Sequence, residues 1–188
     1  MIKIAVFASG SGSNAENLVN FFLNNPVGNV DCILSNNSNA YVLERSKKLG
    51  VDSLVFNREE FYDTNIVLDY LNSRKIDFIV LAGFLWLVPE NLIKSYPSKI
   101  VNIHPALLPK YGGKGMYGMN VHKAVVEAKE SESGITIHYV NAHYDEGNII
   151  RQEKCELTST DTPEDVAQKV HELEYKFFPT VIEEVLKQ

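Results

Sequence analysis

Short apolar runs alternate with segments of helical spacing along the first half of the chain. Runs rich in β-forming apolar residues predict strands at 3–8, 30–34, 51–56, 78–82 and 100–103. Apolar residues that recur at helical intervals predict helices at 15–25, 41–49 and 61–73. Strands separated by helices of this length indicate βαβ units, and therefore a doubly wound, mostly parallel sheet.

The second half of the chain has a different pattern. A glycine-rich segment at 112–118 leads into a predicted helix near 120–129. Apolar and polar residues alternate more clearly at 134–140 and 149–157, which is typical of antiparallel or edge strands. We therefore expect antiparallel strands late in an otherwise parallel sheet.

A long terminal helix is predicted to begin at Pro163, with Thr162 or Asp161 as its cap. No internal repeat, low-complexity tract or linker separates one part of the chain from another. We therefore expect one α/β domain over 1–188.

The composition excludes several classes of protein. The 188 residues include 18 Lys and Arg against 24 Asp and Glu, and the formal net charge of −6 argues against a general nucleic-acid binder. No apolar run approaches the roughly 20 residues that a membrane-spanning helix needs. Cys32 and Cys155 lie far apart with no CxxC pair, so we expect reduced thiols in a cytoplasmic protein.

The loop after the first predicted strand offers an anion site. Gly10–Ala15 fits the pattern G-x-G-x-x-[GA], but no acidic residue follows at the end of the next strand to hold a dinucleotide ribose. The loop supplies glycine-freed backbone amides, two hydroxyls and a helix N-terminus, which together suit one phosphate. The alternative is a tight turn without a ligand.

Asn102-Ile103-His104-Pro105 ends another predicted strand at the same sheet edge. Alternation along a strand places Asn102 and His104 on one side, where an amide and an imidazole could stabilise an oxyanion and move a proton. A carboxylate is needed to orient the ring, and Asp145 is the best candidate. The alternative is a structural histidine satisfied by hydrogen bonds.

The remaining histidines are expected to have lesser roles. His138 lies in a predicted strand, either as a packed residue or as a partner of the catalytic side chains. We expect His122 and His143 at the surface and His171 on a solvated face of the last helix. Because neither HExxH nor an HxH pair occurs, a metal site is not expected. Trp86 belongs either to the core or to the wall of a site for a flat aromatic ligand.

Four segments together resemble a known family: Ser9-Gly10-Ser11-Gly12-Ser13-Asn14, Leu81-Ala82-Gly83-Phe84, Asn102-Ile103-His104-Pro105-Ala106-Leu107-Leu108-Pro109 and Asp145-Glu146-Gly147. In them the chain resembles the phosphoribosylglycinamide formyltransferases of the formyltransferase superfamily. The likeness runs from Met1 to the last helix, and it implies the Rossmann-like formyltransferase fold.

The resemblance also implies an activity. The formyl group of 10-formyltetrahydrofolate would pass to the amine of glycinamide ribonucleotide (GAR), giving formyl-GAR and tetrahydrofolate in de novo purine (IMP) biosynthesis. The implied partners are small molecules only, with no nucleic acid and no membrane, for a cytoplasmic monomer or homodimer.

Site residues follow from the same resemblance, position by position. The implied catalytic residues are Asn102, His104 and Asp145. The chemistry of these groups agrees, because the close charge of Asp145 should raise the pKa of His104, whose imidazolium would stabilise the oxyanion and act as the acid. The implied GAR-binding residues are Gly12, Ser13 and Asn14 at the phosphate and Glu174 at the sugar. The implied folate-binding residues are Leu85, Trp86, Leu87, Val88, Asn102, Val140 and Asn141. Phosphate binding would thus fall in about 1–100, and catalysis and folate binding in about 101–188, with no metal.

The chain departs from the family pattern in places. Trp86 occupies a position often held by Arg, and His171 stands where some members have Gln. Arg58 is not assigned to the folate tail because its spacing differs. The segment 111–118 is longer and richer in glycine than in some members, so we expect a mobile flap.

Three alternatives remain at this point. Formyltetrahydrofolate hydrolase shares the catalytic set but has an extra N-terminal domain, and methionyl-tRNA formyltransferase has an extra C-terminal domain. We expect room for neither, since the chain starts at the first strand and stops after the last helix. The third alternative is a non-catalytic nucleotide- or phosphate-binding module.

Overall fold

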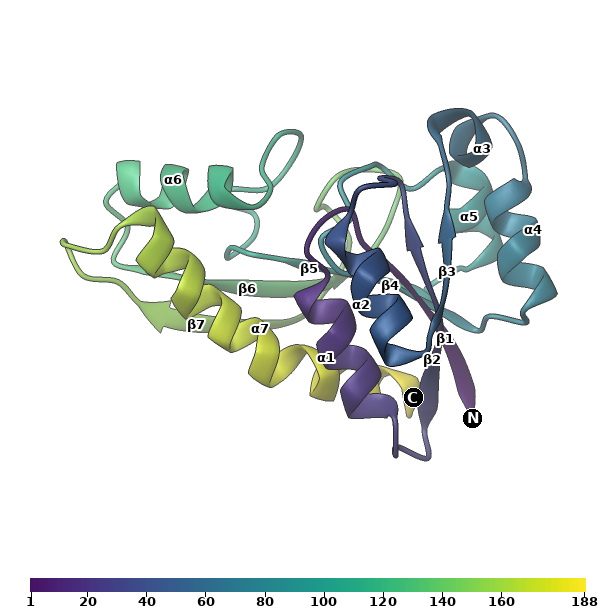
Figure 1. The fold of residues 1–188 in the computed structure, drawn as a ribbon. Helices are drawn as coiled ribbons and strands as arrows, with labels where there is room; N and C mark the ends of the chain where they lie inside the picture. The colour runs from purple at the N-terminus through teal and green to yellow at the C-terminus, as the bar shows by residue number, and fades with distance from the viewer.

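Seven strands form one sheet in the order β3-β2-β1-β4-β5-β6-β7 in the computed structural model, which describes residues 1–188 (Figure 1). The strands are β1 (Ile2–Phe7), β2 (Gly28–Ser35), β3 (Asp52–Val55), β4 (Phe78–Leu81), β5 (Ile100–His104), β6 (Glu132–Tyr139) and β7 (Ile149–Glu156). Strands β1 to β5 pair in parallel, whereas β5–β6 and β6–β7 pair antiparallel. The predicted doubly wound, mostly parallel sheet with antiparallel late strands is confirmed.

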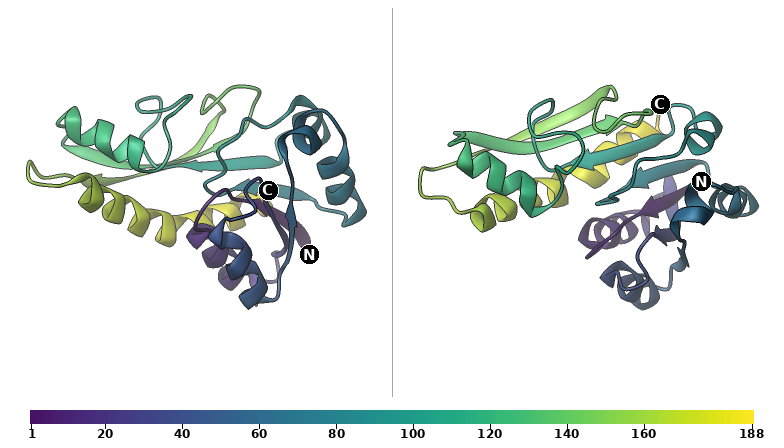
Figure 2. Two further views of the ribbon diagram at one scale, coloured as in Figure 1. Left: turned by 45° about the horizontal axis from the view of Figure 1, so that its top comes forward. Right: turned by 90° about the horizontal axis from the view of Figure 1, so that it is seen from above.

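Helices cover both faces of the sheet. They are α1 (Ser13–Phe22), α2 (Tyr41–Leu49), α3 (Arg58–Tyr62), α4 (Ile66–Ser73), α5 (Glu90–Ser95), α6 (Met119–Glu127) and α7 (Pro163–Leu186). Successive side chains of β1 point to opposite faces of the sheet. Ile4 and Val6 therefore pack in the layer of α1, α6 and α7. Ala5 and Phe7 pack in the layer of α3, α4 and α5. Figure 2 shows the strong twist that turns β6 and β7 away from the direction of β1 and β2.

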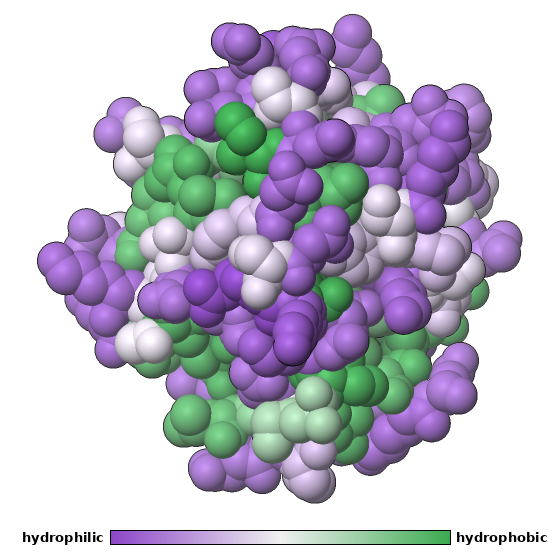
Figure 3. Space-filling model, turned by 90° about the vertical axis from the view of Figure 1, so that its right-hand side faces the viewer, coloured by the Kyte–Doolittle hydropathy of each residue, from purple (hydrophilic) through white to green (hydrophobic).

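The outer surface of the α3–α5 layer is mixed in character. Seen from that side, hydrophobic side chains show between hydrophilic ones (Figure 3). Ile66, at the start of α4, is 47% exposed although its neighbour Val67 is buried in the core. Scattered exposure of this kind is ordinary for a protein surface.

One predicted helix is divided in two. The segment 61–73 was expected to be continuous, but α3 ends at Tyr62 and α4 begins at Ile66. Asn57 and Glu60 form a capping box that starts α3 upstream of the predicted boundary. Thr64 then donates its hydroxyl to the Glu60 carbonyl, and the chain turns before α4. The short helix α5, which follows Pro89, was not predicted.

The last helix begins where the sequence indicates. Thr162 is the cap, in a capping box with Asp165, and Pro163 occupies the first helical turn. Asp161 does not cap it, and instead forms an ion pair with Lys169 at 2.5 Å. None of the helices is both long and apolar enough to cross a membrane.

The strand order reverses beside β1, and this reversal sets the position of the site. Strand β1 lies between β2 and β4, so the loops that leave β1 and β4 diverge to opposite faces and leave a crevice at their carboxyl ends. The two loops are tied at its base, because the Ser9 amide donates to the Gly83 carbonyl at 3.0 Å and the Leu85 amide to the Ser9 hydroxyl at 3.0 Å.

Candidate active site

A cavity of about 890 Å³ opens at this crevice. Its walls come from the loop after β1, the segment after β4, the end of β5, the segment 113–118, the loop before β7 and the middle of α7. The cavity lining includes all the predicted site residues except Asn141: Gly12, Ser13, Asn14, Leu85, Trp86, Leu87, Val88, Asn102, His104, Val140, Asp145 and Glu174.

One end of the cavity is the N-terminus of α1. Gly12 caps this helix with a φ of 73°, and no side chain satisfies the first amides. A Cβ at Gly12 would lie 2.2 Å from a methyl group of Val42, so only glycine fits here. Unpaired N–H groups and the helix dipole make this end suitable for an anion, despite the net charge of −6.

Asn14 and Glu174 close this end from opposite parts of the chain. Asn14 Nδ2 donates to Glu174 Oε2 at 2.8 Å, whereas Asn14 Oδ1 is buried and has no hydrogen-bond partner. Glu174 also contacts His171 Nδ1 at 3.1 Å, and this hydrogen bond raises the pKa of His171. The side chain of His171 is 45% exposed, in line with the expected solvated face, and it also lines the cavity.

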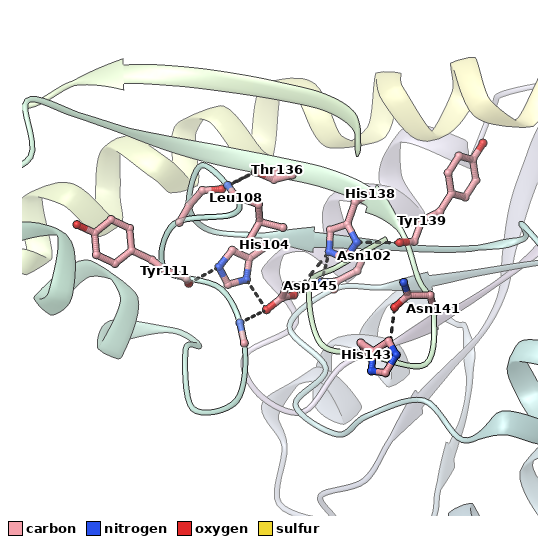
Figure 4. A network of polar contacts seen from close by, with 12 residues as sticks. Asn102, His104, Leu108, Tyr111, Thr136, His138, Tyr139, Asn141, His143 and Asp145 are labelled. Carbon is pink, nitrogen blue, oxygen red and sulfur yellow. Dashed lines mark hydrogen bonds and ion pairs between the residues drawn. The ribbon is translucent and has the colours of Figure 1, made fainter. Parts of the chain in front are cut away.

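Three side chains meet on the other wall of the cavity (Figure 4). Strand β5 carries Asn102 and His104, and Asp145 approaches from the loop between β6 and β7. Asp145 Oδ2 lies 3.5 Å from His104 Nδ1, and Asp145 Oδ1 lies 3.5 Å from Asn102 Nδ2. The structure thus brings the predicted carboxylate to the predicted imidazole and amide.

The protonation of His104 differs from the expectation. Burial lowers the pKa of His104 below its ordinary value and outweighs the opposing effect of Asp145. Asp145 acts in the expected direction, but the prediction of a raised pKa is wrong, because the ring is only 4% exposed. The imidazole is therefore neutral at pH 7.

Asp145 remains ionised beside this neutral ring. Burial opposes its ionisation, but the imidazole groups of His138 and His104, together with the Gly113 amide, hold the pKa of Asp145 below its ordinary value. Its backbone φ of 56° lies in the left-handed region, so the loop holds this residue in a conformation that costs free energy.

His138 is the partner that orients Asn102. Its Nδ1 lies 2.8 Å from the Tyr139 carbonyl, which can only accept, so Nδ1 carries the hydrogen and Nε2 is an acceptor. Asn102 Nδ2 donates to this Nε2 at 3.1 Å. His138 is 2% exposed and contacts Asn102, so it is both a packed residue and a partner of the predicted catalytic side chains.

His122 was wrongly expected at the surface. It is 6% exposed, lies on α6 and lines the cavity, and its Nδ1 has no hydrogen-bond partner. Its neighbours Val121 and Val125 are buried, and this apolar spacing was the signal in the sequence that could have found it. His143 is exposed, as predicted.

The segment after β4 forms an apolar wall. Val88 is buried and Leu85 is 42% exposed, and the Tyr62 hydroxyl holds the segment by donating to the Leu87 carbonyl at 2.9 Å. Trp86 stands edge-on to Phe56 with ring centroids 6.1 Å apart. Aromatic and aliphatic faces of this kind suit a flat ring system.

Arg58 does not line the cavity, but it stacks on that wall. Its guanidinium lies 4.9 Å from the ring centroid of Tyr62 and 5.9 Å from that of Trp86. Asn141 also stands outside the cavity lining, and its Oδ1 accepts from the His143 amide at 2.9 Å, which shapes the loop before Asp145.

The glycine-rich segment 111–118 forms the roof of the cavity. The Gly113 amide donates to Asp145 Oδ2 at 2.9 Å, and the Tyr111 carbonyl lies 2.8 Å from His104 Nε2. The start of this segment is therefore hydrogen-bonded to the wall formed by Asn102, His104, His138 and Asp145, which we call the catalytic wall after its predicted residues. No group of three or more His, Cys, Asp or Glu side chains is arranged to hold a metal ion.

Comparison with known proteins matches this chain to one family. The family model described as formyl transferase matches residues 2–182. The phosphoribosylglycinamide formyltransferase of Bacillus subtilis (strain 168) is 34% identical over 191 residues, covering 99% of this chain and 95% of that protein. The chloroplastic phosphoribosylglycinamide formyltransferase of Arabidopsis thaliana is 39% identical over 186 residues, or 96% of this chain.

The plant relatives are longer than this chain. The matched part spans 64% of the Arabidopsis thaliana protein and 61% of the chloroplastic phosphoribosylglycinamide formyltransferase of Vigna unguiculata.

Solved structures agree in fold. The phosphoribosylglycinamide formyltransferase of Anaplasma phagocytophilum superposes with a TM-score of 0.90 at 29% identity, covering 100% of this chain and 87% of that chain. The phosphoribosylglycinamide formyltransferase of Streptococcus pneumoniae TIGR4 superposes with a TM-score of 0.86 at 35% identity. The match covers 98% of this chain and 99% of that chain.

Proposed function

Because the chain belongs to the formyl transferase family, we propose that it transfers the formyl group of 10-formyltetrahydrofolate to the amine of GAR. The products are formyl-GAR and tetrahydrofolate, as in de novo purine synthesis. One observation carries the proposal: His104 and Asn102 each lie 3.5 Å from Asp145, on the wall of the cavity that also contains the N-terminus of α1.

The acceptor would bind with its phosphate at the N-terminus of α1. Gly12, Ser13 and Asn14 offer backbone amides that no side chain caps, and this supports a phosphate there. Asn14 Oδ1, which is buried without a partner, suits a hydroxyl donor of the sugar. Glu174 adds a carboxylate beside it that accepts from hydroxyls.

His104 would move the protons of the transfer. The amine nitrogen attacks the formyl carbon, a C–N bond forms, and the carbonyl electron pair moves onto oxygen. The neutral Nδ1 of His104 takes the proton that the amine loses, and Asp145 stabilises the resulting imidazolium. The oxyanion then re-forms the C=O bond as the bond to the folate nitrogen breaks, and that nitrogen keeps the electron pair and receives the same proton. Protons and electrons balance without a metal or a covalent intermediate.

Asn102 would stabilise the oxyanion. One N–H of its Nδ2 amide donates to His138 Nε2. The other N–H has only the long 3.5 Å contact with Asp145 Oδ1. This second N–H is the donor that turns to the charged oxygen as it forms, and such donors typically contribute about 3 kcal/mol to catalysis.

The folate would bind against the apolar wall. Leu85, Trp86, Leu87 and Val88 present apolar surface on one side, and Val140 and Asn141 precede the catalytic loop on the other. Leu85–Val88 lie in 1–100 and Glu174 lies in 101–188, so both ends of the cavity draw on both halves. We therefore treat 1–188 as one functional unit.

One copy of the chain would carry a complete site. All the residues around the cavity belong to a single chain, so the proposal holds for a monomer or a homodimer. A cytoplasmic location is part of the proposal, supported by two cysteines that form no disulfide.

The release of tetrahydrofolate, followed with and without GAR, tests the proposal. Release that depends on GAR and yields formyl-GAR is the expected result. Release at the same rate without GAR identifies a hydrolase instead. GAR that binds by calorimetry with no release identifies a binding module and removes the enzymatic assignment.

A further inference from the structure

The tautomer of His104 is set by the backbone of the roof segment. Its Nε2 lies 2.8 Å from the Tyr111 carbonyl oxygen, which only accepts hydrogen bonds. Nε2 must therefore carry the hydrogen, and Nδ1, which faces Asp145 at 3.5 Å, is the nitrogen free to gain and lose a proton.

The same segment holds the carboxylate as well. Two residues after Tyr111, the Gly113 amide donates to Asp145 Oδ2 at 2.9 Å. The short stretch 111–113 thus presents an acceptor to the imidazole and a donor to the carboxylate. Tyr111 adopts a φ of 57° in this stretch, a left-handed conformation that costs a non-glycine residue about 1 kcal/mol or more.

A side-chain anchor outside the cavity holds that conformation. The Tyr111 hydroxyl donates to Glu130 Oε1 at 2.8 Å, and Lys110 Nζ reaches the same oxygen at 2.8 Å. Glu130 lies between α6 and β6, and neither it nor Tyr111 lines the cavity. The anchor therefore acts on the site only through the Tyr111 carbonyl.

We propose that the Tyr111–Glu130 hydrogen bond positions His104 for proton transfer, by holding the Tyr111 carbonyl against Nε2. The inference rests on the formyl transfer proposed above. Tyr111 and Glu130 are positioning residues, since neither side chain reaches the reactants. Lys110 shares the carboxylate but has no part in this function, because its ammonium is exposed.

Kinetics of five variants test the inference. Tyr111→Phe and Glu130→Ala each remove the hydrogen bond, and we expect kcat to fall about threefold to tenfold while KM for both substrates is unchanged. The double variant should lose no more than either single one, because both break the same contact. Glu130→Gln keeps an acceptor for the Tyr111 hydroxyl and should restore kcat, and Lys110→Ala is the matched control that retains it.

A second readout does not depend on activity. The ¹⁵N chemical shifts and ring couplings of His104 report its tautomer, and we expect the Nε2–H form in the intact chain and a mixture in Tyr111→Phe. An Nδ1–H form in the intact chain, or an unchanged tautomer and kcat in both Tyr111→Phe and Glu130→Ala, would overturn the inference. An intact chain that transfers no formyl group would refute the proposed function, while the tautomer would still decide the positioning role.

Discussion

The two ends of the cavity are built in different ways. The loop at 9–14 makes its end from consecutive residues, whose useful groups are backbone amides released by the conformation of Gly12. The catalytic wall takes its side chains from β5, β6 and the loop before β7, and two of its contacts are as long as 3.5 Å. The backbone amides of the first end are a local structure, to which α7 adds Glu174, whereas the second end depends on the whole sheet.

This difference predicts different sensitivities. A change in the backbone should damage the loop end, and a change of one side chain there should cost less. At the catalytic wall, the identity and charge of single side chains would carry the proposed chemistry, so pH should act there. Four measurements separate the two ends, beginning with the largest expected effect.

Replacing the imidazole should stop transfer without removing the acceptor site. We expect His104→Ala to lower kcat by about 10²–10⁴, the usual contribution of a general acid–base group. GAR affinity, measured by calorimetry, should stay close to that of the unchanged chain, because the ring lies on the other wall. Retention of full activity would remove His104 from the mechanism, and thermal unfolding controls for the fold.

Removing the charge of Asp145 should lower the rate of formyl transfer and change the pKa of His104. Asp145→Asn should lower kcat by at least about tenfold, because the imidazolium loses its counter-charge. Asp145, the Tyr111 carbonyl and Glu174 raise the pKa of His104 and His138 lowers it, and of these groups Asp145 has the largest effect.

The direction of the expected shift in the pKa of His104 follows from the charge of Asp145. Burial already holds the pKa of His104 below its ordinary value, and loss of the carboxylate should lower it further. Histidine NMR titration measures this shift in both proteins. A pKa that stays constant or rises in Asp145→Asn would contradict the pairing.

Replacement by alanine should have different effects on stability at two glycines of the loop, Gly12 and Gly10. At Gly12 a Cβ would lie 2.2 Å from Val42 and φ is 73°, so Gly12→Ala should lower the free energy of unfolding by about 1–3 kcal/mol and raise KM for GAR. At Gly10 nothing lies within 4 Å, so Gly10→Ala should change stability by less than about 0.5 kcal/mol. Urea unfolding of both variants measures the contrast, and equal losses would show that the turn is not specific to Gly12.

Stability should fall as the pH is lowered toward 5.5. Burial depresses the pKa of both His104 and His122, so the unfolded chain takes up protons near its own pKa of about 6.5 while the folded chain resists. Their contribution is present above that pH and is lost as the pH falls through the folded pKa values. His171, whose pKa is raised, acts in the opposite sense and is partly exposed.

The urea midpoint at pH 7.5, 6.5 and 5.5 measures this dependence. We expect a loss of about 1 kcal/mol over this range, and His122→Gln should flatten part of the slope. A midpoint that rises toward pH 5.5 would mean that the buried rings are charged in the folded protein.

Much of the fold could be predicted because its determinants are local. The strand periodicity, the cap at Thr162 and the turn at Gly12 all depend on neighbouring residues. The break between α3 and α4 was missed because a capping box at Asn57 outweighed a continuous apolar pattern.

The catalytic wall could be predicted only in part. Spacing along β5 indicates that Asn102 and His104 share a side. The need for a carboxylate made Asp145 the best candidate, but its approach to His104 follows from the β6–β7 hairpin, which spacing along the chain does not give. The pKa of His104 was predicted in the wrong direction because burial of the ring is a property of the packed molecule. His122 was misplaced for the same reason, since its burial depends on where α6 packs.

The hydrogen bond between Asn14 and Glu174 joins residues 160 positions apart, and it has a consequence for synthesis of the chain. The ribosome releases α1 early, but α7, whose buried face includes Val170 and Phe178 and completes the larger core cluster, emerges last. The apolar face of α1 is therefore not fully covered until α7 has been synthesised and has packed against it. Completion of the core and formation of the Asn14–Glu174 hydrogen bond therefore occur in the same late event. On the function proposed above, a nascent chain would gain its affinity for GAR only after this helix has docked.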